Sequence, residues 1–210
     1  MDAFQVVRDG YDRIGTRYRD ASRENPIRMQ WVEWLLDELA PGSLVLELGC
    51  GAGEPATRLL ADHHRVVGVD ASFVQLRLAR SAAPGAALVQ ADMTRLGVRS
   101  ESVDAVTSFY AFGHVPQADH VPLLRSIAAW LRPNGWLLAN LPVQAGDARS
   151  ESWLGVPMFF GGIAPPLARQ TIEEASLVID QWSIVPEMES DGRTVEFAWL
   201  VARKLASASP

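Results

Sequence analysis

The stretch that decides the fold runs from residue 45 to 56 and reads Val45-Leu46-Glu47-Leu48-Gly49-Cys50-Gly51-Ala52-Gly53-Glu54-Pro55-Ala56. Its first part is a short apolar run interrupted only by Glu47, which is typical of a buried strand. The glycines that follow allow a tight turn and let a ligand approach the backbone closely. A helix expected over about residues 55–61 would offer free N–H groups and the positive end of its dipole. Such a loop is expected to bind the polar part of a nucleotide-like cofactor at the carboxyl end of a sheet.

The alternation of strand and helix continues outward from this loop. Strands are expected at residues 43–48, 65–70, 88–90, 103–109 and 136–141, with helices at about 72–82 and 119–131. Continuous apolar strands that alternate with helices indicate a parallel sheet covered on both faces. Two further strands, 177–187 and 194–203, are separated by Ser190-Asp191-Gly192, a hairpin signal. The predicted fold is α/β: a doubly wound, mostly parallel seven-stranded sheet with a C-terminal antiparallel hairpin strand.

The chain is expected to form one domain with four parts. Residues 1–42 form an N-terminal helical cap, in which residues 1–24 are a short helix or a flexible arm and Asn25-Pro26 starts a second helix. Residues 43–141 form the cofactor-binding core. Residues 142–170 form a substrate-covering insertion whose Gly/Pro/aromatic part, 146–166, looks irregular. Residues 171–204 form the C-terminal helix and hairpin.

Composition excludes several functions. The 210 residues contain 19 Lys+Arg and 25 Asp+Glu, a net charge of −6, which argues against nucleic acid as a partner. The single cysteine, Cys50, excludes an intramolecular disulfide framework and a multi-cysteine zinc site, and no metal is expected. No run of residues approaches 18 apolar positions, and residues 1–5 lack the order of a secretion signal. No membrane partner and a cytoplasmic location are therefore expected.

The acidic residues around the glycine loop discriminate between two classes of cofactor. Asp70 ends the second strand, 21 residues after Gly49, a spacing that suits a carboxylate bonded to ribose hydroxyls. Gly51-x-Gly53-x-x-Ala56 formally satisfies the dinucleotide fingerprint. However, Glu47 and Glu54 would place negative charge near a pyrophosphate, whereas a carboxylate can hold an ammonium group. A cofactor with an amino-acid end and a cationic centre fits this environment better.

Five segments together resemble the class I S-adenosylmethionine (SAM)-dependent methyltransferases of the small-molecule type. Glu47-Leu48-Gly49-Cys50-Gly51-Ala52-Gly53 is similar to the family's motif I. The other four are similar to the family's second, third and fourth strands and the turn into its fifth: Val67-Gly68-Val69-Asp70-Ala71-Ser72, Gln90-Ala91-Asp92-Met93, Val103-Asp104-Ala105-Val106-Thr107-Ser108-Phe109 and Leu131-Arg132-Pro133-Asn134-Gly135-Trp136-Leu137-Leu138. Most members have glycine where this chain has Asn134, and asparagine also tolerates a positive φ.

The resemblance implies SAM as the cofactor and S-adenosylhomocysteine (SAH) as its product. Motif I would supply Glu47, Gly49, Cys50, Gly51 and Gly53 to the cofactor site, with Cys50 as a small buried residue. Asp70 and Ala71 would lie at the ribose, Ala91 and Asp92 at the adenine, and Met93 on the face of its ring. Ser108 and Phe109 would lie near the methionine and methyl end.

The segment from residue 108 to 116 is expected to carry the acceptor side of the site, because it leaves the carboxyl end of the fourth strand. His114 is the candidate base or substrate-orienting residue, since histidine can take a proton near neutrality. The alternative is that His114 caps a helix or packs structurally. Tyr110 is expected to contact the acceptor. His63 and His64 precede the second strand at the opposite end of the sheet and are expected at the surface.

Aromatic residues outside the core are the remaining candidates. Tyr11 and Tyr18 resemble an N-terminal pair that folds over the cofactor in similar proteins, or they belong to an amphipathic helix that faces the core. Trp153, Met158, Phe159 and Phe160 are expected to cover the acceptor, with Gly155, Gly161 and Gly162 giving mobility. The alternative is a hydrophobic loop packed on the sheet.

The predicted function is methyl transfer from SAM to a small-molecule acceptor, aromatic or apolar, by in-line displacement. N-, O- and C-methylation all stay open. Two alternatives are an NAD(P)-dependent oxidoreductase and a SAM-binding partner protein without catalysis. The expected partner is a small molecule, and association into a homodimer stays open.

Overall fold

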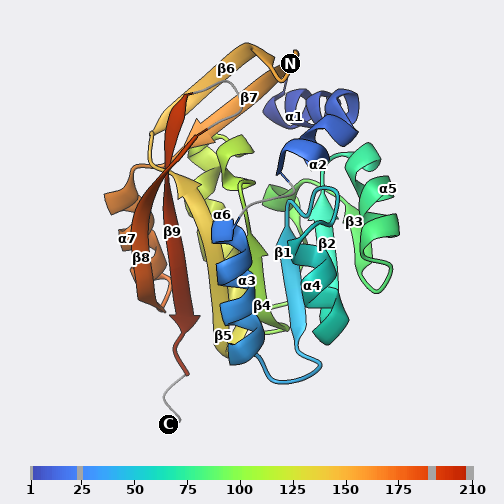
Figure 1. Cartoon of the computed structure of the whole chain (residues 1–210). Helices are drawn as coiled ribbons and strands as arrows, with labels where there is room; N and C mark the ends of the chain where they lie inside the picture. The colour runs from blue at the N-terminus through green and yellow to red at the C-terminus, as the bar shows by residue number, and fades with distance from the viewer. Residues whose placement is uncertain (1, 23–25, 189–192, 207–210) are drawn as a thin grey trace.

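The apolar runs form a seven-stranded sheet in the computed structural model of the chain, which describes residues 2–22, 26–188 and 193–206 (Figure 1). The strand order is β3-β2-β1-β4-β5-β9-β8. The strand bounds are β1 (Leu44–Leu48), β2 (Arg65–Asp70), β3 (Ala87–Gln90), β4 (Val103–Ser108), β5 (Leu131–Pro142), β8 (Leu177–Met188) and β9 (Thr194–Lys204). Strands β1 to β5 pair in parallel, whereas β9 runs antiparallel to both β5 and β8. The predicted fold class is confirmed.

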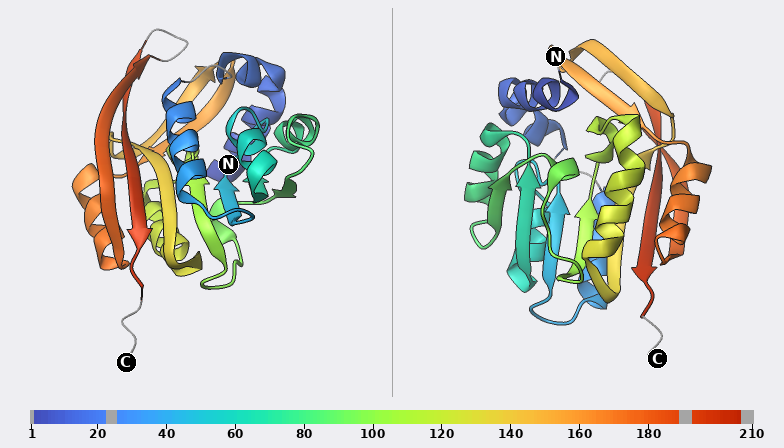
Figure 2. Two further views of the ribbon diagram at one scale, coloured as in Figure 1. Left: turned by 60° about the horizontal axis from the view of Figure 1, so that its bottom comes forward. Right: turned by 180° about the vertical axis from the view of Figure 1, so that it is seen from behind.

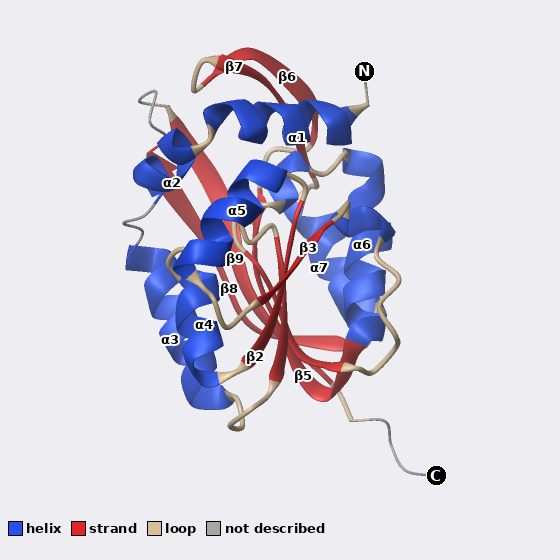
Figure 3. Ribbon diagram, turned by 90° about the vertical axis from the view of Figure 1, so that its right-hand side faces the viewer, coloured by secondary structure: helices blue, strands red, loops and turns tan. Residues whose placement is uncertain are grey.

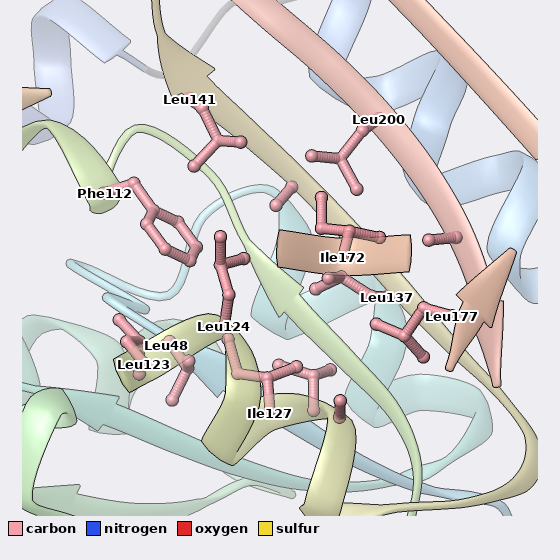
Figure 4. Packing of buried hydrophobic residues seen from close by; sticks show 14 of the residues in the cluster. Leu48, Phe112, Leu123, Leu124, Ile127, Leu137, Leu141, Ile172, Leu177 and Leu200 are labelled. Carbon is pink, nitrogen blue, oxygen red and sulfur yellow. The ribbon is translucent and has the colours of Figure 1, made fainter. Parts of the chain in front are cut away.

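Helices cover both faces of this sheet (Figure 2). One face carries α3 (Pro26–Glu38), α4 (Ala56–His63) and α5 (Phe73–Ala82), and the other carries α6 (Gln117–Trp130) and α7 (Pro165–Glu174). On the α6 face, Leu124 and Ile127 pack against Leu48 and Leu137 of the strands, all of them fully buried (Figure 4). Burial on both faces explains why the strands read as continuous apolar runs rather than alternating ones.

Local rules explain where several elements begin and turn. Ser72 is the N-cap of α5, because its side chain accepts a hydrogen bond from the Gln75 N–H. Asn134 adopts φ 66°, which confirms that this position needs a residue tolerant of positive φ. The helix expected from Asn25-Pro26 begins at Pro26, whereas Asn25 lies outside the described residues, as do hairpin-turn residues 190–192.

Two helices and a small sheet lie above the carboxyl edge of the parallel strands (Figure 3). The helices are α1 (Ala3–Ile14) and α2 (Thr16–Ser22), and the sheet is the hairpin of β6 (Gly146–Trp153) and β7 (Val156–Gly162). The expectation of an irregular insertion over 146–166 was therefore wrong. The hairpin forms because Met158 and other apolar residues of β7 bury themselves against Val6, Val7 and Ile14 of α1.

Close packing, and not mobility, explains two glycines of this hairpin. A Cβ on Gly161 would lie 2.0 Å from the Val115 carbonyl oxygen, and one on Gly162 would lie 2.0 Å from the Gln144 carbonyl oxygen. Any side chain there would push β7 away from the segment after β4. The prediction that these glycines make the hairpin mobile finds no support in these contacts, since they fix the hairpin's position.

The histidine pair before β2 divides between surface and interior. His63 is exposed, but His64, which follows directly on α4, is buried, contrary to expectation. Burial lowers the pKa of His64. In the parts of the chain that the structure describes, every helix is too short or too polar to cross a membrane. Within the same ranges, no three His, Cys, Asp or Glu side chains gather closely enough to hold a metal ion.

Candidate functional site

The loop between β1 and α4 depends on glycine for its shape. Gly49, Gly51 and Gly53 all have positive φ, at 74°, 54° and 80°. The N–H groups of Gly49 and Cys50 donate to the Val69 carbonyl oxygen at 2.8 and 3.0 Å, which fixes the loop to the end of β2. A Cβ on Gly49 would lie 2.3 Å from the Ala111 Cβ, so this glycine also permits contact with the segment after β4.

Asp70 joins the glycine loop to the start of α5. Its Oδ2 accepts from the Gly51 N–H and its Oδ1 from the Ser72 N–H, each at 2.8 Å. Burial raises the pKa of Asp70 to about 6, although these two N–H groups favour the carboxylate form. The acid is therefore held rigidly at the strand end, with lone pairs left for a further donor.

A cavity of about 190 Å³ lies at the carboxyl edge of the sheet, where the strand order reverses between β1 and β4. Seven predicted site residues line it: Gly49, Asp70, Ala71, Ala91, Asp92, Met93 and His114. Asp92 is oriented by donation from the Thr94 N–H and hydroxyl, at 2.9 and 2.7 Å. The cavity thus collects the ends of three neighbouring strands and the turn after β4.

Glu47 lies on β1, two residues before the glycine loop, and is 3% exposed. Burial raises its pKa to about 7, against the opposing influences of the Thr57 side chain and the Arg28 charge. Its Oε2 has no hydrogen-bond partner in the described structure. A buried carboxylate oxygen without a donor is costly, and a cationic or hydrogen-bonding ligand group would relieve that cost.

His114 is the last residue of the short helix η2 (Phe112–His114), and two hydrogen bonds from other elements hold its ring. Its Nδ1 lies 2.9 Å from the Phe159 carbonyl oxygen, and its Nε2 lies 2.7 Å from the Tyr11 hydroxyl. Burial lowers the pKa of His114 to about 4, so the ring is neutral at pH 7. Because a carbonyl oxygen only accepts, Nδ1 carries the proton and Nε2 accepts from the Tyr11 O–H. This arrangement makes Nε2 the basic nitrogen, with its lone pair directed at the Tyr11 hydroxyl.

Aromatic rings from four elements gather around this histidine. Tyr11 packs edge-to-face on His114 at 5.2 Å between ring centres, and on Tyr18 at 4.9 Å. Trp153 of β6 and Phe160 of β7 lie 6.0 and 5.3 Å from the His114 ring centre. Tyr18 also lies above the glycine loop, 3.8 Å from where a Cβ of Gly51 would be. We call Tyr11, Tyr18, His114, Trp153 and Phe160 the aromatic cluster.

Other predicted residues do not line the cavity, among them Tyr11, Tyr18, Glu47, Gly51, Gly53, Trp153 and Phe160. Ser108 and Phe109 are buried. Cys50 is also buried, and its Sγ lies 2.9 Å from the position that a Cβ on Gly68 would take. Tyr110 turns its side chain toward β8, where its hydroxyl donates to the Glu187 carboxylate at 2.6 Å. Its φ of 61° directs it there.

Two residues of β7 pack inward instead of lining the cavity. Met158 is fully buried against Gly10 of α1. The Phe159 side chain is 5% exposed, and this residue reaches the site through its backbone carbonyl. Both were expected to contact the acceptor, because sequence alone does not show which face of this strand is covered.

Several residues that line the cavity were not predicted from the sequence. The cavity is also lined by Asp2, Phe4, Val7, Val69, Thr94, Arg95, Val115, Pro116 and Asp119. The start of α1 contributes three of them. Apolar residues at helical spacing, such as Phe4 and Val7, indicate an amphipathic helix, but they do not say what its apolar face covers.

Known proteins resemble this chain over the segment that contains the glycine loop. Residues 45–135 match the family described as Methyltransferase domain. Trans-aconitate 2-methyltransferase of Azoarcus sp. (strain BH72) is 37% identical over 107 residues, which cover 50% of this chain and 41% of that protein. A ubiquinone biosynthesis O-methyltransferase of Paracidovorax citrulli is 27% identical over 171 residues, covering 79% and 68%. The matched part of the chain thus spans less than half the length of the first relative and about two thirds of the second.

A solved structure shares the fold. Magnesium protoporphyrin IX methyltransferase from Synechocystis, determined with bound SAH, superposes with a TM-score of 0.70 at 17% identity. The superposition covers 97% of this chain and all of that one. At this level of identity the likeness concerns the fold alone.

Proposed function

We propose that this chain, whose residues 45–135 match the family described as Methyltransferase domain, transfers a methyl group from SAM to a small-molecule acceptor. The observation that carries the proposal is one juxtaposition. A neutral His114, whose Nε2 accepts from the Tyr11 hydroxyl, lines the same cavity as Gly49, Asp70 and Asp92.

The residues at the cavity suit the cofactor. SAM supplies an electrophilic methyl group on a sulfonium centre. Asp70 would bind the ribose hydroxyls and Asp92 the adenine amino group, with Met93 against the ring. Glu47 would receive the ammonium group, since its unpartnered Oε2 is a buried acceptor. Arg28 supplies a neighbouring positive charge that would balance a carboxylate at the same end.

His114 would take the acceptor's proton. The Phe159 carbonyl holds the Nδ1–H, which orients the ring and leaves Nε2 as the basic atom. The Tyr11 hydroxyl occupies that lone pair in this structure, so an acceptor hydroxyl would replace it or bond to its oxygen. Burial has lowered the pKa of His114 to about 4, which makes it a weak base until the developing charge of the reacting centre assists it.

The aromatic cluster defines the class of acceptor that we propose. Its rings present apolar faces and few charges, so an uncharged aromatic or apolar acceptor fits better than a polyanion. The one cationic side chain that lines the cavity among the described residues, Arg95, lies 3.6 Å from Asp92. A phenolic hydroxyl is therefore the acceptor that we favour over a carboxylate.

Two measurements test the proposal. SAH and SAM should raise the melting temperature of the protein, and stabilisation by NAD alone would contradict the assignment. Methyl transfer should then be followed with labelled SAM on matched phenolic and carboxylate acceptors. Phenolic acceptors should react faster, and a preference for carboxylates would overturn the acceptor class. Binding of SAH without turnover of any acceptor would favour a SAM-binding partner protein.

Replacing the histidine tests its role directly. His114→Ala should lower kcat by about 100-fold, the usual contribution of a general base, while the SAH affinity stays within about threefold. His120→Ala is the comparison, because that buried histidine bonds to the Val115 carbonyl oxygen from α6 and does not line the cavity. An equal loss of kcat and SAH affinity in His114→Ala would make His114 a structural residue.

A further inference from the structure

Helix α1 ends beside the loop that presents the ribose-binding acid (Figure 3). Its first residues line the cavity, whereas its last full turn carries Tyr11 and Asp12. Successive helical residues point about 100° apart, so these neighbours reach different parts of the site. Tyr11 reaches His114 on the acceptor side, as described above.

Asp12 reaches the cofactor side. Its Oδ1 accepts from the Ser72 hydroxyl at 2.5 Å and from the Val74 N–H at 3.1 Å. Ser72 is also the residue whose N–H donates to Asp70, and whose hydroxyl accepts from Gln75. One carboxylate on α1 is thus bonded to the short segment 70–74 that orients the ribose-binding acid.

A second contact fixes the same end of α1. The side-chain amide of Gln75, which is fully buried, donates to the Gly15 carbonyl oxygen at 2.9 Å. Gly15 ends the helix with φ 55°. The end of α1 is therefore attached by two hydrogen bonds to the Asp12 carboxylate and by one to the Gly15 carbonyl oxygen. Hydrogen bonds to charged groups are the stronger kind.

The rest of α1 is attached differently. Its buried face packs on β7 through apolar contacts, among them Val6, Val7 and Ile14. Apolar contacts hold the helix down but are not directional, so they do not by themselves fix its position along the cofactor loop. The directional contacts are concentrated at residues 11, 12 and 15.

We infer that Asp12 is a positioning residue for the methyl-transfer site. It holds the end of α1 against the ribose loop, and thereby sets Tyr11 at His114 while closing the helix over the cofactor. The cavity of about 190 Å³ is smaller than the roughly 300 Å³ at which pockets for whole ligands begin, and Phe4 and Val7 of α1 line it. The Asp12 contacts hold this helical wall of the cavity in place. The inference rests on the proposed function, because it concerns the same site.

Three variants test this role in the full-length protein. Asp12→Ala should weaken SAH binding, measured by calorimetry, by about tenfold, although Asp12 does not line the cavity. Asp12→Asn keeps an oxygen that accepts from the same two donors, so it should restore the affinity to within about threefold of the parent. Asp9→Ala is the matched control, because Asp9 lies on the same helix and pairs with its neighbour Arg8 at the surface. It should change SAH affinity less than twofold.

A second measurement needs no substitution. Hydrogen exchange of the parent protein should show that SAH slows exchange in residues 3–14 together with the first turn of α5. Equal exchange in residues 3–14 with and without SAH would overturn the inference. An Asp12→Ala variant with parental SAH affinity, an equal loss in Asp9→Ala, or no rescue by Asp12→Asn would overturn it as well.

These outcomes separate the inference from the proposed function. If the parent does not bind SAH, the proposed function fails and the role of Asp12 fails with it. If the parent binds SAH and transfers methyl groups while Asp12→Ala behaves like the parent, only the role of Asp12 is overturned.

Discussion

The two halves of the site are held in place by different kinds of contact. On the cofactor side, backbone geometry does the work: positive φ at Gly49 and Gly53, and N–H groups bonded to a strand end. On the covering side, α1 and the β6–β7 hairpin are held by side chains, with aromatic rings packed around His114. Figure 1 shows these two halves meeting at the carboxyl edge of the sheet.

This difference has a consequence for substitution and for function. A backbone conformation that needs glycine tolerates few other residue types, so replacing the glycine has a severe effect on the loop. A cluster of rings can be rebuilt from other apolar residues, at a smaller cost in stability but with a changed acceptor pocket. Changes on the cofactor side should therefore affect SAM binding, and changes on the covering side should affect turnover and acceptor choice.

The largest effect is expected from Gly49→Ala. The alanine would have to adopt a left-handed backbone conformation, and its Cβ would lie 2.3 Å from the Ala111 Cβ. Strain and overpacking together should cost on the order of 3–5 kcal/mol of stability, and SAH binding should be lost. Chemical unfolding and calorimetry measure the two effects.

Gly97→Ala is the control for this change. Gly97 lacks a positive φ, and its added Cβ would meet no atom of the described structure within 4 Å. The variant should match the parent in both stability and SAH affinity. A Gly49→Ala variant with parental SAH affinity would show that the glycine loop does not carry the cofactor.

A smaller effect with the opposite pattern is expected from Gly161→Ala. Its Cβ would lie 2.0 Å from the Val115 carbonyl oxygen, so β7 must move away from the segment that carries His114. Overpacking should cost about 2–3 kcal/mol. The kcat should fall by more than tenfold because the Phe159–His114 bond is displaced, while SAH affinity should change by less than threefold. If SAH affinity falls as much as kcat, the two halves are not separable.

The smallest effect concerns pH and should be a gain in stability. The pKa of Glu47 is raised from 4.5 to about 7 in the folded protein, so the folded state binds the proton more tightly than the unfolded state. Ionisation therefore costs stability, beginning above pH 4.5 and complete above about pH 7. Glu47→Gln should be more stable than the parent at pH 8, with the difference vanishing near pH 4.

Melting curves between pH 4 and 8 measure this difference, with Glu33→Gln as the exposed control on α3. The same Glu47→Gln variant should bind SAM more weakly than the parent at pH 8, because the ammonium group loses a charged acceptor. A stability difference that does not depend on pH would contradict the buried-acid interpretation. Parental SAM affinity would remove Glu47 from the cofactor site.

The sequence supported the cofactor side because its constraints are local. Gly49, Asp70 and Asp92 lie directly after strands, and parallel strands bring their carboxyl ends to one edge whatever the details of packing. The structure places these three around one cavity. The segment after β4 was harder to interpret, since a single backbone angle at Tyr110 sends that side chain to Glu187 instead of the cavity.

The covering side could not be derived in the same way. An irregular segment was expected over residues 146–166, because no local pattern shows that β7 has α1 to pack against. Gly161 was expected to give mobility, but its role depends on a carbonyl 46 positions earlier in the chain. Asp12 looked like one acid among many, and only the fold brings it to Ser72.

The sequence by itself determined which segments form strands and helices, where the glycine loop lies, and which acids follow the strands. Propensity, glycine geometry and the alternation of elements act over a few residues, so a local pattern is enough to show them. The tertiary structure alone decided how α1 and β6–β7 cover the cavity. It also decided which nitrogen of His114 is basic and how Asp12 ties the two halves together. Those features depend on contacts between segments more than 40 residues apart, whose partners no local pattern specifies.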